Sequence, residues 1–111
     1  MSYSIIPTHR FEKEIKRLVK KFPSLKGEYT ALINEIIQNP KAGTFIGNNC
    51  YKLRIAISSK GKGKSGGARV ITYVYIDTET VYLLTIYDKS EKQDLEPNEL
   101  KIMIESLELD V

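Results

Sequence analysis

The segments Tyr51–Ile55, Ala68–Tyr73 and Leu83–Tyr87, with the sequences YKLRI, ARVITY and LLTIY, decide the fold of this chain. Each is rich in β-branched and aromatic residues, which favour strands. A stretch of Ser, Lys and Gly at 58–67, SSKGKGKSGG, separates the first segment from the second and indicates an exposed loop. The sequence therefore predicts three strands of one sheet, at about 50–57, 68–76 and 81–87.

The remaining segments predict elements that support this sheet. The short run Tyr3–Ile6 is β-prone and is stopped by Pro7, so we expect a further strand there. Apolar residues recur at helical spacing after Thr8 and again after Ser24, and both residues are good helix N-caps. Helices are expected at about 9–21, from Ser24 to Asn39, and from near Pro97 onward.

The order of these elements, β-α-α-β-β-β-α, is typical of an α+β domain. We expect a single domain, 1–111, with a four-stranded, largely antiparallel sheet and the two N-terminal helices packed on one face. Side-chain alternation places Tyr82, Leu84 and Ile86 on that covered face. The opposite face is predicted to be a basic active-site face that carries Lys52, Arg54, Arg69, Tyr73, Tyr87 and Lys89.

Composition places the chain among ordinary globular proteins, with 41% hydrophobic and 28% charged residues. No apolar run approaches the roughly 20 residues that span a bilayer. The N-terminus lacks the pattern of a signal peptide, and the single cysteine, Cys50, cannot form an internal disulfide. We therefore expect a cytoplasmic protein with no membrane partner.

Positive charge is concentrated in one part of the chain. The window 36–76 holds seven of the 17 Lys and Arg residues and none of the 14 Asp and Glu residues. Phosphate backbones are the commonest polyanions that such a surface would bind. A charged loop that serves solubility is the alternative.

The residue types limit the chemistry that this chain can perform. One His and one Cys cannot build a metal cluster, and Gly61–Gly67 lacks the spacing and context of a nucleotide-binding loop, so no metal or cofactor is predicted. Arg, Lys and Tyr side chains bind phosphates and stabilise developing negative charge. They permit metal-free RNA cleavage, in which a 2′-OH attacks the adjacent phosphorus.

Three motifs, at 43–54, 61–73 and 83–95, resemble the RelE/ParE superfamily of type II toxins, with the HigB-like proteins as the nearest branch. The resemblance implies a toxin that is an mRNA interferase, an endoribonuclease that cleaves mRNA in the ribosomal 30S A site without metal and inhibits translation. It also implies a cognate antitoxin with a helix-turn-helix or RelB-like DNA-binding domain. Operator DNA would then be bound only through the antitoxin.

The resemblance also suggests roles for single residues. Arg54 and Arg69 match positions of phosphate-contacting basic residues, and Tyr87 and Lys89 match further site residues, so these four are the predicted catalytic residues. The general base is not identified. The predicted RNA-binding residues are Lys52, Lys60, Lys62, Lys64, Tyr73 and Lys92.

Several alternatives stay open at this point. A ParE-like gyrase inhibitor shares the fold, and a non-catalytic RNA-binding or antitoxin-binding protein would carry the same charges. Tyr87 could be a packed aromatic at a strand end, and Arg69 could form a salt bridge with Asp77 or Asp88. Cys50 is expected to be a small buried strand residue, and Asp88 to be solvated.

Overall fold

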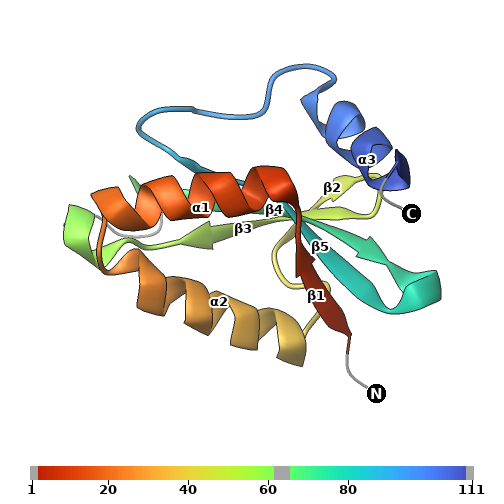
Figure 1. Ribbon diagram of the computed structural model, residues 1–111, viewed down its shortest axis with the longest axis horizontal. Helices are drawn as coiled ribbons and strands as arrows, with labels where there is room; N and C mark the ends of the chain where they lie inside the picture. The colour runs from red at the N-terminus through yellow and green to blue at the C-terminus, as the bar shows by residue number, and fades with distance from the viewer. Residues whose placement is uncertain (1–2, 62–65, 110–111) are drawn as a thin grey trace.

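The computed structural model describes residues 3–61 and 66–109 as a five-stranded sheet with helices on both faces (Figure 1). The strand order is β1-β5-β4-β3-β2, in which β1 is parallel to β5 and the other pairs are antiparallel. No helix in the described part of the chain is long and apolar enough to cross a membrane. The elements are β1 (Ser4–Pro7), α1 (His9–Lys21), α2 (Leu25–Gln38), β2 (Thr44–Gly47), β3 (Cys50–Ile55), η1 (Ser58–Lys60), β4 (Ala68–Tyr75), η3 (Ile76–Thr78), β5 (Thr80–Asp88) and α3 (Glu99–Leu109).

The predicted α+β class is confirmed, but the predicted number of strands was one too low. The missed strand, β2, forms a hairpin with β3 in which Gly47 is paired with Cys50. The two residues between them, Asn48 and Asn49, have φ angles of 53° and 60°. Positive φ at both central residues is what a type I′ hairpin turn requires, and Asn tolerates it well. Sequence analysis missed β2 because a strand of four residues is too short to show a clear side-chain alternation.

Helices α1 and α2 bury their apolar sides against one face of the sheet, as predicted. Phe11 and Leu18 of α1 and Leu25 of α2 are fully buried among side chains of β3, β4 and β5. Thr8 caps α1, since its hydroxyl accepts a hydrogen bond from the amide of Phe11. Ser24 does not cap α2 as expected. Its hydroxyl bonds Glu28 and Ser59 instead.

A β-bulge in β5 corrects the predicted alternation of that strand. Ile71 of β4 is paired with Thr85 and its neighbour Thr72 with Leu83, so Leu84 is left without a partner. As a result Ile86 packs with the α1 and α2 side, whereas Tyr82 and Leu84 pack on the opposite side of the sheet. A bulge shifts the side-chain period by one residue, and simple alternation along 81–87 could not reveal it.

The face opposite α1 and α2 is not an open basic surface. Helix α3 covers part of it (Figure 1), and Met103 and Leu107 of α3 pack there on Ile71, Leu84 and Tyr87. Cys50 belongs to the same cluster, is fully buried as expected, and has its pKa raised to about 12 by burial. The predicted polar face is therefore reduced to the end of the sheet that α3 leaves uncovered.

Candidate active site

Three predicted site residues form one row across the sheet. Arg54 of β3 is paired with Arg69 of β4, and Arg69 is paired with Tyr87 of β5. Paired residues of adjacent strands point to the same face, so the row lies on the side where α3 packs. The predicted convergence of Arg69 and Tyr87 is therefore present in the structure.

The two arginines of this row differ in exposure. Arg69 is 5% exposed, and its Nη1 donates a hydrogen bond to the carbonyl of Ala68 at 3.2 Å. Arg54 is exposed at the open edge of β3, where it lines a shallow pocket with Glu28 and Glu35 of α2. Arg69 is thus buried next to Tyr87, while Arg54 lies near the carboxylates of α2.

Tyr87 has an unusual environment for a phenol. The residue is 6% exposed, and its hydroxyl is buried without a hydrogen-bond partner among the described residues. Burial raises the pKa of Tyr87, Asp94 adds to that shift, and Arg69 acts against it. The phenol is therefore protonated at neutral pH and has a donor free for a ligand, but it is a poor general base.

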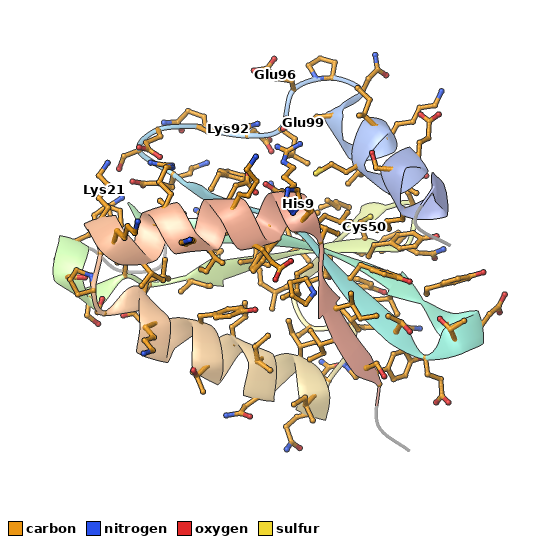
Figure 2. The ribbon with its side chains drawn as sticks, in the orientation of Figure 1. His9, Lys21, Cys50, Lys92, Glu96 and Glu99 are labelled. Carbon is orange, nitrogen blue, oxygen red and sulfur yellow. The ribbon has the colours of Figure 1, made fainter. Side chains whose placement is uncertain are left out.

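The ammonium of Lys92 lies over the Tyr87 ring. Its Nζ lies 5.8 Å from the ring centroid. The same ammonium donates hydrogen bonds to both oxygens of Glu99, at 2.8 and 2.6 Å. In Figure 2, Lys92 on the loop after β5 and Glu99 at the start of α3 lie on the same side of α1.

Two other predicted cations border this group. Lys52 is two residues before Arg54 on β3 and is paired with Ile71 of β4. Its Nζ lies 3.4 Å from Oδ1 of Asp94. The ammonium of Lys89 donates to the carbonyl of Gln93 at 2.7 Å. Both ammonium groups thus contact the segment after β5 that carries Gln93 and Asp94. The roles predicted for them in catalysis and RNA binding stay predictions.

Lys60 and Tyr73 lie away from the row. Lys60 forms an ion pair with Asp88, and its Nζ lies 5.4 Å from the ring centroid of Phe22, which packs in the α1 and α2 core. Asp88 is 1% exposed, so the expectation that it is solvated was wrong. Tyr73 is four residues along β4 from Arg69, about 13 Å at the rise of a strand, and packs beside α3. Lys62 and Lys64 lie outside the described residues.

Sequence reasoning missed the acidic residues around the site. Asp94 and Glu99 each contact a predicted site lysine, and Arg10 of α1 donates a hydrogen bond to Glu99 at 2.5 Å. Arg10 and Glu99 are 89 residues apart in the chain, and no spacing rule connects them. Only the motif that contains Asp94 pointed toward this region.

Comparisons with known proteins identify the family and the fold of this chain. The family model described as the RelE toxin of the RelE/RelB toxin–antitoxin system matches residues 9–107. The isolated E. coli RelE toxin has the same fold, with a TM-score of 0.59 and 16% identity over 98% of this chain and 99% of that one. A doubly substituted variant of E. coli RelE in the free state gives a TM-score of 0.62 and 19% identity over 84% and 90% of the two chains. The intact E. coli RelBE toxin–antitoxin complex gives 0.59 and 19% over 78% and 95%. The chain therefore belongs to the RelE toxin family, within the RelE/ParE superfamily of type II toxins.

Proposed function

We propose that this toxin is a ribosome-dependent endoribonuclease that cleaves mRNA in the 30S A site and so inhibits translation in the cytoplasm. The observation that carries the proposal is the pairing of a buried Arg69 with Tyr87, whose buried phenol has no hydrogen-bond partner within residues 3–61 and 66–109. A buried donor without a partner is costly in the free protein and is explained if a ligand supplies the acceptor.

In the proposed reaction the 2′-hydroxyl passes its proton to solvent and its oxygen forms a bond to the adjacent phosphorus. The bond from phosphorus to the 5′-oxygen breaks, and this oxygen takes up a proton. The products are a 2′,3′-cyclic phosphate and a 5′-hydroxyl. Arg69 would bind the non-bridging oxygens, on which negative charge develops. The protonated Tyr87 would donate to the phosphate or to the leaving oxygen.

A cognate antitoxin is part of the proposal. E. coli RelE is found in complex with the antitoxin RelB, and the same kind of partner, with a RelB-like or helix-turn-helix DNA-binding domain, would neutralise this toxin. Operator DNA would be contacted through that partner. A HigB-like assignment within the superfamily stays a prediction.

The proposal is tested by cleavage of a defined mRNA in a purified translation system, with and without ribosomes. We expect cuts only when ribosomes are present, and a loss of at least ~100-fold in rate for Arg69→Ala. Lys26→Ala, which removes one exposed positive charge from α2, is the matched control and should cleave like the wild type. Intact mRNA together with blocked gyrase supercoiling would instead indicate a ParE-like toxin. Intact mRNA with unaffected supercoiling would indicate a non-catalytic binding protein.

A further inference from the structure

Glu99 connects the start of α1 to the loop that leads into α3. Its carboxylate accepts hydrogen bonds from Arg10 at the start of α1, from Lys92 on the loop after β5, and from the amide of Glu96 at 2.7 Å. The Glu99 side chain is 13% exposed, compared with 29% for Lys92. Burial alone would raise the pKa of Glu99, but the bonds from Lys92 and Arg10 lower it to about 2. The carboxylate is therefore charged and fixed at every physiological pH.

The contact between Glu99 and Lys92 has a consequence for the site. A lysine side chain is long and loses considerable rotamer freedom when it is held in one position. Glu99 engages the Lys92 ammonium through both carboxylate oxygens, and the ammonium lies on the Tyr87 ring. Because Lys92 stays partly exposed, it can still meet a phosphate oxygen from the position where Glu99 holds it.

We propose that Glu99 is a positioning residue for the cleavage site, which fixes the Lys92 ammonium beside Tyr87 so that it meets the scissile phosphate in a productive geometry. The proposal rests on the proposed nuclease function and deepens it. Glu99 touches neither the phosphate nor the reacting atoms, and its positioning effect is exerted through Lys92. Docking of α3 on α1, through Arg10 and Glu99, thereby becomes part of the active-site geometry.

A positioning role predicts that a change at Glu99 affects the cleavage rate but not the affinity for RNA. Glu99→Gln removes a negative charge near the RNA, so long-range attraction to phosphates does not decrease. A mobile Lys92, in contrast, no longer occupies the position that lowers the barrier. Glu99→Gln should therefore bind RNA at least as tightly as the wild type but cleave it more slowly.

The test is a double-mutant cycle that joins Glu99→Gln with Lys92→Ala. The single-turnover cleavage rate is measured at saturating toxin on ribosome-bound mRNA, and affinity is measured with the same mRNA 2′-O-methylated at the cleavage position. We expect Glu99→Gln to cleave ~10- to 100-fold more slowly without loss of affinity. In the Lys92→Ala background it should have no further effect on the rate.

Two control variants separate positioning from folding. Glu105→Gln makes the same charge change on an exposed residue of α3 and should leave the rate unchanged. Arg10→Gln removes the contact to α1 but leaves the pair of Glu99 and Lys92. It should therefore lower the melting temperature and leave the cleavage rate of the folded protein nearly unchanged. Glu99 also acts to raise the pKa of Tyr87, so the alkaline decline of the rate should move to lower pH in Glu99→Gln.

The outcomes are distinguishable. Two results would overturn the inference while the wild type still cleaves. Either Glu99→Gln cleaves as fast as the wild type, or it slows cleavage by the same factor with Lys92 and with Lys92→Ala. A wild-type protein that leaves ribosome-bound mRNA intact overturns the proposed function, and the inference with it.

Discussion

The ammonium of Lys60 and the carboxylate of Asp88 form an ion pair that is nearly closed to solvent, with side-chain exposures of 8% and 1%. Burial acts to raise the pKa of Asp88, but the hydrogen bonds from Lys60 and from the amide of Ser90 outweigh it and lower that pKa. The pair ties η1 to the end of β5, directly after Tyr87. Lys60 thus stabilises the structure on the side of the sheet where Phe22 packs.

Lys60→Ala should therefore reduce activity mainly by destabilising the fold. It leaves the charge of Asp88 buried without its ammonium partner, which typically costs about 3–5 kcal/mol. Denaturant unfolding measures this loss, and Lys26→Ala is the control because that lysine is exposed and has no ion-pair partner among the described residues. If Lys60→Ala keeps wild-type stability but loses RNA affinity, Lys60 is an RNA contact as the sequence predicted.

Glu99 should make the protein more stable at neutral pH than at pH 2. Its pKa is about 2 in the folded protein and near 4.5 in an unfolded chain. A carboxyl with a lowered folded pKa contributes its full stability above the unfolded value, and the contribution is lost as pH falls toward the folded one. The free energy of unfolding should therefore drop between about pH 5 and pH 2.

Glu99→Gln should flatten this acid limb, which chemical denaturation at several pH values would show. Asp88 also has a lowered pKa, so a smaller decline should persist in the variant. An unchanged slope in Glu99→Gln would mean that the bonds from Arg10 and Lys92 do not form in solution.

Tyr87→Phe should separate stability from activity. The phenol oxygen is buried and has no partner in the described part of the chain, so removing it discards a desolvated polar group without breaking a hydrogen bond. We expect a melting temperature equal to or above that of the wild type, together with a cleavage rate reduced by ~10²-fold or more. A destabilised variant would show that the hydroxyl is bonded in solution.

The elements that could be predicted are those with local signals. The helix at 9–21 was expected with the bounds that α1 has, because Thr8, the apolar spacing and Pro23 mark it unambiguously. Alternation within each strand was enough to place Arg69 and Tyr87 on the same face of the sheet, but their direct pairing depends on the bulge. The bulge at Leu84 and the cover of α3 on the sheet depend on packing between distant segments, which carries no local signature.

The contacts of the acidic residues around the site, Asp94 and Glu99, were also beyond prediction from the sequence. Lys52 and Lys92 were predicted as free cations for RNA, yet Asp94 and Glu99 lie against their ammonium groups. An acidic residue in a loop is usually solvated, so its sequence position alone does not suggest a partner. The contact between Glu99 and Arg10 in addition depends on how α3 packs against α1.

Two glycine substitutions should change stability in opposite directions. A Cβ on Gly67 would lie 1.9 Å from the carbonyl oxygen of Ile55, which is backbone and cannot move aside as a side chain could. The carbonyl of Gly67 also accepts the amide of Lys89 at 3.0 Å, so any shift of Gly67 disturbs the turn after Tyr87. Gly67→Ala should lose at least ~2 kcal/mol of stability and most of the cleavage rate.

Gly27→Ala is the matched control, since it adds the same methyl group to the chain. Gly27 lies in the first turn of α2, and a Cβ there meets no atom within 4 Å. Alanine is about 1 kcal/mol better than glycine inside a helix, so this variant should unfold at higher denaturant concentration and cleave normally. If Gly67→Ala and Gly27→Ala change the stability and the cleavage rate equally, Gly67 does not lie close to the carbonyl of Ile55 in solution. The position of the turn after Tyr87 depends on that close approach.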